Sequence, residues 1–388
     1  MKATLRPSGE RAGPHARRAE TNAENGISLM GRVYASRKEF GQAVEANERA
    51  LELNPNSAEA WSGRWNQLLL MNKQEEALAA IRKATELDPE TVRYQTALAQ
   101  QLFQLSRAEE AIYVLRETIR RHPDNPGLYT ALSRYLNQVG KAGEAMWYLQ
   151  TIRRRDPGNM SIFQAVCLQY WQLWDNPSAI DCYEEYIEAV PDDLEGQLER
   201  ARIAGEYDEA VRIARLKVEQ QPNVWFAKMQ LADFLAFTGE WEGIIETVSA
   251  VFPDLMSSEP EITDWKQWGA RRLAGALLRT GQIEQANLLI EATLTHFERS
   301  RKLQAGGSIA GPEDALLHAL RGENELALDS MERAIVRDWI FFAQAIIEDP
   351  ALDNLRDNPR FIELVDRLRQ NVTREREWFE NNKDRVQL

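Results

Sequence analysis

The chain has 388 residues, of which 44% are hydrophobic and 28% are charged, and its formal net charge is −13 at pH 7. A net negative charge opposes binding to the phosphate backbone, so direct nucleic-acid binding is not expected. The sequence contains no run of about 18 apolar residues that could span a membrane and no apolar core of a secretory signal near its N-terminus. We therefore predict a cytoplasmic protein.

Residues 1–23 are rich in Gly, Pro and Arg and show no apolar periodicity. We predict that they form a disordered tail. Its arginines could serve as a docking arm for an anionic partner, although a solvated terminus is the simpler interpretation. These arginines are Arg6, Arg11, Arg17 and Arg18.

From Glu24 onward the sequence repeats with a period of 34 residues. Five prolines mark this period, each at the end of a helical pattern: Pro55, Pro89, Pro123, Pro157 and Pro191. Within a repeat, apolar residues at positions 4, 7 and 11 form one face of a first helix, and those at 17, 20, 24 and 27 form one face of a second. Proline at position 32 ends the second helix because it cannot continue the backbone hydrogen bonding. A fixed period of this length predicts stacked helix pairs.

The period divides the chain into segments. We predict seven repeats at 24–57, 58–91, 92–125, 126–159, 160–190, 191–224 and 225–252, a loop at 253–263, two further repeats within 264–338, and a C-terminal capping segment at 339–388. The shortened spacing from Pro191 to Pro222 is expected to bend or tighten the stack.

Two residues depart from the repeat pattern. Asn47 puts a polar side chain on the apolar face of the second helix of repeat one. Such interruptions are common in the terminal repeats of an array. Trp65 stands at position 8 of repeat two, where two helices approach closely and a small residue is needed. We therefore predict that this helix pair is splayed or that its first helix is rotated.

The pattern resembles the tetratricopeptide repeat family, whose spacing is Trp, Leu-Gly, Tyr, Ala, Phe, Ala, Pro over 34 residues. Repeat one matches it with Met30, Gly31, Tyr34, Phe40, Ala43, Ala50 and Pro55. The resemblance implies an all-α fold, a right-handed α-solenoid of about nine helix pairs with a C-terminal capping helix. Residues 349–369 also resemble the segment that closes such arrays in bacterial adenylate cyclases, serine/threonine kinases and winged-helix regulators.

In this family the first helices line a concave groove through positions 2, 5, 9, 12 and 13, so the resemblance implies a peptide-binding groove in repeats one to five. Carboxamides dominate these positions, which also hold three arginines and two large aromatics. The residues are Arg32, Asn66, Arg93, Gln100, Phe103, Gln104, Arg134, Asn137, Gln138, Gln164, Trp171 and Gln172. A carboxamide can both donate to and accept from a peptide backbone, and aromatics supply buried area. The alternative is that these are ordinary surface residues.

Chaperone-binding members of the family clamp a terminal carboxylate with Lys, Asn and Arg at set positions. Here those positions hold Ser28, Arg32, Gly63, Arg93 and Ala97. The clamp is missing in this frame, so binding of a chaperone tail is not predicted.

We find no catalytic constellation, metal site or cofactor motif in the sequence. The four histidines lie in different parts of the chain: His15, His122, His296 and His318. Cys167 and Cys182 occupy positions 8 and 23 of one repeat and could lie near each other. Two cysteines do not make a disulfide framework, and we favour buried thiols over a redox pair.

These observations predict a non-enzymatic scaffold that binds a protein, either as a peptide or as a partner helix, in the concave groove. Two alternatives stay open. One is a sensor or regulatory module that serves a bacterial signalling enzyme or a transcription regulator, which the resemblance of residues 349–369 suggests. The other is an accessory subunit of a glycosyl- or sulfotransferase.

Overall fold

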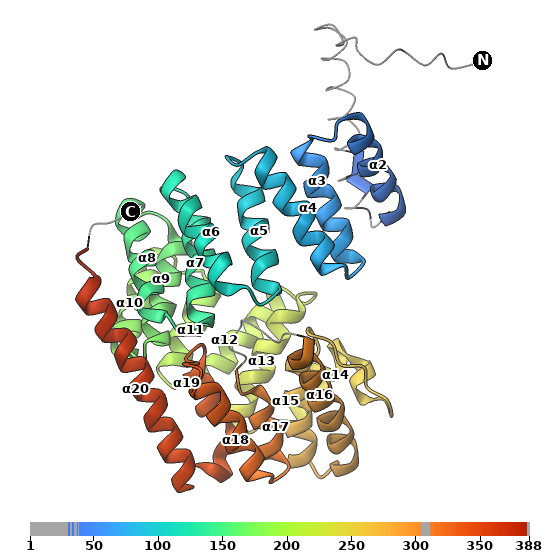
Figure 1. Cartoon of the computed structure of the whole chain (residues 1–388). Coiled ribbons are helices and arrows are strands. Elements are labelled where there is room, and N and C mark those ends of the chain that lie inside the picture. Colours follow the sequence, from blue (N-terminus) through green and yellow to red (C-terminus); the bar gives the residue numbers. More distant parts are fainter. Residues whose placement is uncertain (1–29, 32, 35–36, 38, 304–310, 386–388) are drawn as a thin grey trace, which may run out of the picture. The chain divides into compact units, whose positions relative to one another are not determined.

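The computed structural model describes residues 30–31, 33–34, 37, 39–303 and 311–385. Throughout these residues the regular secondary structure is helical, which confirms the predicted all-α repeat fold (Figure 1). The chain divides into an N-terminal body, residues 1–122, and a C-terminal body, residues 123–388, and each is considered by itself. None of the described helices is both long and apolar enough to cross a membrane.

The N-terminal body consists of alternating first and second helices. They are α2 (Phe40–Leu53), α3 (Ala58–Leu70), α4 (Gln74–Leu87), α5 (Val92–Gln104) and α6 (Ala108–Arg121). The Ser57 hydroxyl accepts a hydrogen bond from the Ala60 amide (3.2 Å) and so caps α3. Pro55 and Pro89 follow the ends of α2 and α4, where helical hydrogen bonding stops.

The C-terminal body continues the alternation. Its repeat helices are α7 (Pro126–Gln138), α8 (Ala142–Arg155), α9 (Met160–Gln172), α10 (Asn176–Ala189), α11 (Leu194–Ile203), α12 (Tyr207–Gln220), α13 (Trp225–Thr238), α14 (Trp241–Val251), α15 (Gln267–Arg279), α16 (Ile283–Leu303), α17 (Glu313–Leu320) and α18 (Asn324–Ile335). The 3₁₀ helix η1 (Pro253–Met256) follows α14, and α19 (Ala343–Ile347), the 3₁₀ helix η2 (Pro350–Leu355) and α20 (Pro359–Asn382) follow α18.

Small side chains set the close approach of neighbouring helices. The alanines at position 20 of repeats one to five are all buried: Ala43, Ala77, Ala111, Ala145 and Ala179. A methyl group there lets the backbones of facing helices pack at the density of a protein interior. A larger side chain at these positions would overpack the contact and destabilise it.

Two positions that depart from the repeat are accommodated by their neighbours. Asn47 is buried beside two glycines, and a Cβ on Gly63 would come within 2.5 Å of the Asn47 Oδ1 atom. Trp65 is also buried, and its Nε1 donates a hydrogen bond to the Gln101 side chain of the next first helix (3.1 Å). The splayed pair expected around Trp65 is not found, because α3 and α4 make the most extensive contact of any two described helices.

The C-terminal helix α20 packs on α18, the last second helix of the array, as a capping helix should. It also lies along α8 (Figure 1). The Gly143 amide at the start of α8 donates to the Glu375 carboxylate of α20 (2.9 Å). A Cβ on Gly143 would collide with the Glu375 carbonyl oxygen, so glycine permits this close approach.

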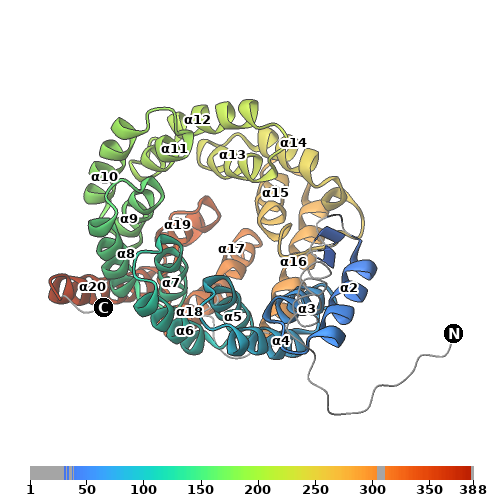
Figure 2. The same cartoon turned by 90° about the horizontal axis from the view of Figure 1, so that it is seen from above.

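Within the C-terminal body the repeat helices follow a curve, and α17 and α19 lie on its inner side (Figure 2). The inner side of this curve is formed by the first helices of the pairs, among them α9, α11 and α13. The residues that precede α19 therefore face the surface on which the groove was predicted.

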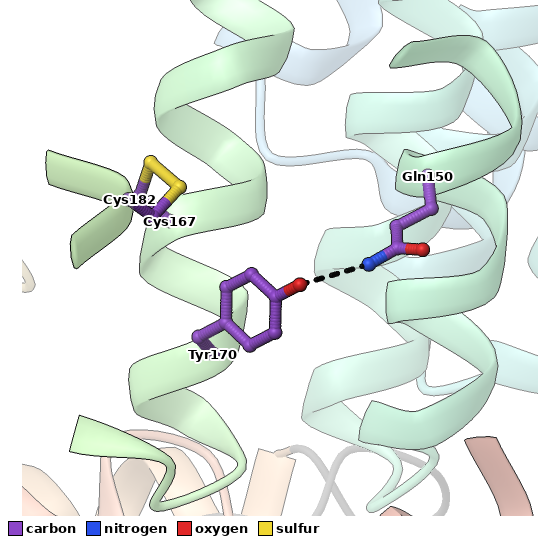
Figure 3. Close-up of a disulfide and its surroundings, with 4 residues drawn as sticks. All are labelled: Gln150, Cys167, Tyr170 and Cys182. Atoms are coloured by element: carbon purple, nitrogen blue, oxygen red, sulfur yellow. Dashed lines mark hydrogen bonds between the residues drawn. A yellow bond between two sulfur atoms is a disulfide. The ribbon is translucent and has the colours of Figure 1, made fainter. Parts of the chain in front are cut away.

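Cys167 of α9 and Cys182 of α10 form a disulfide, with a Cα–Cα distance of 5.3 Å (Figure 3). The sequence-based expectation of two free thiols is therefore wrong. The spacing brings the residues together because positions 8 and 23 face each other within one helix pair. Beside the disulfide, Gln150 of α8 donates a hydrogen bond to the Tyr170 hydroxyl (3.1 Å). Disulfides are rare in the cytosol, so the bond weighs against the predicted cytoplasmic location.

The disulfide should stabilise its helix pair by restricting the unfolded chain. For a sequence separation of 15 residues, reduction should lower the free energy of unfolding by about 3 kcal/mol. The measurement is urea unfolding of the protein with and without reductant. The Cys167→Ala/Cys182→Ala variant serves as the control and should unfold alike under both conditions. Two titratable thiols in the untreated folded protein would contradict the assignment.

Candidate functional site

In the N-terminal body, three of the predicted groove residues have exposed carboxamides on first helices. Asn66 lies on α3, and Gln100 and Gln104 lie on α5. In the part of the chain that the structure describes, none of these three side chains has a hydrogen-bond partner. Their donors and acceptors are therefore available to a ligand.

The adjacent carboxamides have a different role. Gln67 donates to the Ala43 carbonyl (2.6 Å), and Gln101 donates to the Gln74 carbonyl (3.2 Å) and to its side chain (2.9 Å). Both glutamines are buried and link successive helix pairs. They follow Asn66 and Gln100 by one residue, which on a helix turns the side chain by about 100° from the exposed face toward the neighbouring repeat.

The other predicted residues of this body are less available. Arg93 forms an ion pair with Glu59, and the Tyr94 hydroxyl donates to the same carboxylate (2.8 Å). Burial raises the pKa of Tyr94 to about 12, and the hydrogen bond to Glu59 adds to this effect. Phe103 is half-buried. Arg32 lies outside the described residues.

In the C-terminal body, two predicted residues contact other repeat residues. Arg134 is exposed, with its guanidinium 5.3 Å from the centroid of the Tyr135 ring. Asn137 is buried and exchanges two hydrogen bonds with Gln169, at 2.7 and 2.9 Å. This reciprocal amide pair joins α7 to α9, so Asn137 acts in repeat packing.

Trp171 and Gln172 contact residues 338–347, which we call the inner segment. Trp171 is 1% exposed, and its ring centroid lies 5.5 Å from that of Phe342. The Gln172 side-chain oxygen accepts a hydrogen bond from the Phe342 amide (2.9 Å). Just after the C-terminal end of α7, a Cβ on Gly140 would collide with the Asp338 carbonyl oxygen. The chain itself therefore covers this part of the first helices.

A buried ion cluster fixes the end of the inner segment. Arg272 of α15 is paired with Asp233 of α13 and with Asp349, which lies 2.7 Å from it. Trp268 also donates its indole N–H to Asp233 (2.9 Å). Burial lowers the pKa of Arg272, but the two carboxylates raise it by more, so the guanidinium stays charged. The cluster joins α13 and α15 to Asp349, two residues after the end of α19.

The inner segment separates two pockets in the C-terminal body. The first pocket, of about 660 Å³, is lined by Trp339 and Phe341 from the segment and by Gln138. The second, of about 550 Å³, is lined by Phe342 and Ala345 and by Gln164. Phe226 and Trp268 line both. The predicted residues Gln138 and Gln164 thus lie at two different pockets.

The two pockets differ mainly in their aromatic lining. Aromatic rings are more numerous in the first: Trp225, Phe226, Trp265, Trp268, Phe297, Trp339 and Phe341. Both pockets carry charged side chains, which are Asp264, Arg271, Glu313 and Asp314 in the first and Glu195, Glu199, Arg202 and Asp233 in the second. Among the described residues there is no group of three His, Cys, Asp or Glu side chains placed to hold a metal ion.

The sequence feature that could have revealed the inner segment is its apolar run Trp339–Phe342, which holds three aromatic residues. It follows the last repeat and does not continue the repeat pattern. Asp338 and Phe342 have φ angles of 60° and 51°, which are unusual for residues other than glycine. The tertiary contacts to α7 and α9 hold the chain in this conformation, and the repeat pattern contains no information about them.

Removing one partner of the ion cluster should destabilise the C-terminal body. Asp349→Ala leaves the buried Arg272 guanidinium with one carboxylate, and breaking a buried pair in this way costs about 3–5 kcal/mol. Thermal and urea unfolding measure the loss. Asp353→Ala removes an exposed carboxylate that pairs with Arg356, and as the control it should change the stability by less than about 1 kcal/mol. Equal stability of the two variants would contradict this role of Asp349.

Comparison with known proteins identifies the repeats. Residues 71–126 match the tetratricopeptide repeat family model. No curated protein is significantly similar to the chain. One similar solved structure is a tetratricopeptide repeat protein from Parabacteroides merdae ATCC 43184, with 17% identity and a TM-score of 0.47 over 64% of this chain and 97% of that chain.

Two further solved structures are similar at the same level. PilF from Pseudomonas aeruginosa has 19% identity and a TM-score of 0.44, over 56% of this chain and 99% of its own. YrrB, described as a TPR protein with an unusual peptide-binding site, has 20% identity and a TM-score of 0.37, over 48% of this chain and 96% of its own. With TM-scores below 0.5, these likenesses carry no argument about the function of this chain.

Proposed function

Residues 71–126 match the tetratricopeptide repeat family, and we propose that the chain is a non-enzymatic scaffold that binds an extended segment of a partner protein. The proposed binding surface in the N-terminal body is the exposed side of α3 and α5. Its direct contacts are Asn66, Gln100 and Gln104.

The observation that supports this proposal is the contrast between two sets of carboxamides. Gln67 and Gln101 are buried and hydrogen-bonded within the repeats, whereas Asn66, Gln100 and Gln104 are exposed and have no partner in the described part of the body. An extended peptide presents alternating N–H and C=O groups, and each carboxamide can satisfy one of each. A row of such groups therefore suits a backbone better than it suits one particular side chain.

Apolar and electrostatic features add to the proposed surface. Leu70 and Met71, at the end of α3, are 59% and 57% exposed and offer area for a partner's apolar side chains. The net charge of −13 would favour basic partners, mainly through faster association at low salt. In the C-terminal body we propose Gln138 and Gln164 as separate contacts at the two pockets.

No observation on the described residues favours the alternative roles in signalling or group transfer. Most of the stretch that resembles the closing segment of signalling proteins lies in η2 and in the first part of α20. There it packs against α17 and α18. This packing supports a closing role for the segment within the array.

The proposal predicts that the three exposed carboxamides contribute to peptide affinity. Peptides selected from a displayed random library on the wild type should bind the Asn66→Ala/Gln100→Ala/Gln104→Ala variant more weakly by roughly 1 to 3 kcal/mol, the loss of up to three hydrogen bonds. Calorimetric titration measures both affinities. Helix content should not change, because none of the three residues contributes to repeat packing.

A matched control removes three exposed side chains from second helices of the same body: Gln42→Ala, Glu45→Ala and Glu75→Ala. This variant should bind the selected peptides as the wild type does. Equal affinity of the peptides for the wild type and for the carboxamide variant would refute the proposed surface. So would a selection that yields no binding peptide.

A further inference from the structure

Arg271 of α15 lines the first pocket, and among the described residues it has no hydrogen-bond or ion-pair partner. Its Nε atom is buried and makes no hydrogen bond within the part of the chain that the structure describes. No ion pair to its guanidinium is found among the described residues either. The side chain is otherwise partly exposed, toward the pocket that it lines. Its sequence neighbour Arg272, in contrast, is paired with two carboxylates.

An arginine in this situation is costly. Its guanidinium carries five N–H donors and stays charged at physiological pH. Burial lowers the pKa of Arg271 and repulsion from Arg272 lowers it further, while the carboxylates of Asp349, Asp233 and Glu313 offset part of this lowering. An arginine begins so far above neutrality that it remains a cation. The buried Nε–H group has lost its hydration and has no acceptor, which costs free energy. A ligand oxygen at this position would remove that penalty.

The acidic side chains at the pocket have partners of their own. Asp264 lies 3.0 Å from the His296 ring nitrogen. Asp314 accepts a hydrogen bond from Ser330 and lies 3.4 Å from Arg333. Glu313 also makes polar interactions within the chain. Among the described residues, no carboxylate lies at contact distance from Arg271, and Glu313 at the pocket attracts it only at longer range.

The rest of the pocket wall is aromatic. The Trp225 ring is nearly perpendicular to that of Trp265, with centroids 5.8 Å apart, and to that of Trp268, at 6.5 Å. Phe226 contacts Trp268 at 5.5 Å. Such rings offer both faces and edges to a flat apolar molecule. The volume of about 660 Å³ falls within the usual range for small-molecule sites.

We propose that this pocket binds a small aromatic molecule that carries one anionic oxygen group, with its rings among the tryptophans and its anionic group on Arg271. Aromatic pockets with carboxylates can also hold organic cations. Here the carboxylates are already partnered and the guanidinium is not, so an anion fits the charge balance better. This site is independent of the peptide surface proposed on α3 and α5, because it lies in the other body and uses none of the same residues.

Two dyes with the same aromatic body test the proposal. The anionic probe is 8-anilinonaphthalene-1-sulfonate, and N-phenyl-1-naphthylamine is the same skeleton without the sulfonate. We expect the anionic dye to bind the full chain with one-to-one stoichiometry and with energy transfer from tryptophan. Arg271→Met should weaken the anionic dye about tenfold or more, the effect of losing a charge-assisted hydrogen bond. Its effect on the neutral dye should be less than twofold.

Two further variants make the test decisive. Arg212→Met removes an exposed guanidinium from α12 that pairs with Glu209, and it should leave the affinity of both dyes unchanged. Arg271→Lys keeps the positive charge on a slightly shorter side chain, so it provides the test should Arg271→Met not fold. It should lower the affinity for the anionic dye, by less than about tenfold, and leave the affinity for the neutral dye unchanged. The proposal is overturned if the anionic dye does not bind, or if the Arg271 variants weaken both dyes alike or neither dye.

Discussion

Arg272 and its two carboxylates are the interaction on which the interior of the C-terminal body depends. A buried guanidinium must be paired, and the partners here are Asp233 of α13 and Asp349, two residues beyond the inner segment. The pairing holds the inner segment against the first helices. There the Phe342 ring covers Trp171, and the Phe342 amide donates a hydrogen bond to the Gln172 side chain. Because the segment crosses this surface, the space inside the repeats becomes two pockets in place of one open groove. Asp233 and Asp349 are both paired with Arg272, so neither of them contacts Arg271.

The carboxamides of the first helices show how the same residue type can serve two purposes. At position 10, Gln67, Gln101 and Gln169 are buried and hydrogen-bond to neighbouring repeats. At position 9, Asn66 and Gln100 face outward. The helical turn of about 100° between adjacent residues separates the two roles. A buried carboxamide is retained because its loss would leave a partner unsatisfied, whereas an exposed one has no such structural reason in this chain.

The helical repeat could be predicted from the sequence because its determinants are local. The proline spacing and the buried alanines such as Ala111 recur at a fixed interval, and each acts through its own or the next helix. The candidate site could be predicted only in part. Trp171 has a groove position, but its burial depends on Phe342, which lies far along the chain and outside any repeat. The disulfide and the hydrogen bond from Trp65 to Gln101 likewise depend on distances between helices that a residue pattern does not contain.

Hydrogen–deuterium exchange in the inner segment, measured by mass spectrometry of peptides that cover residues 338–347, reports whether this segment covers the first helices. The Phe342 amide, which donates to Gln172, should exchange on the order of 100-fold more slowly than in an unstructured peptide. In Gln172→Ala the same amide should exchange faster, while α9 and α10 keep their protection. Exchange of the wild-type segment at the rate of an unstructured peptide would contradict the account. The first helices would then present an open groove at Trp171.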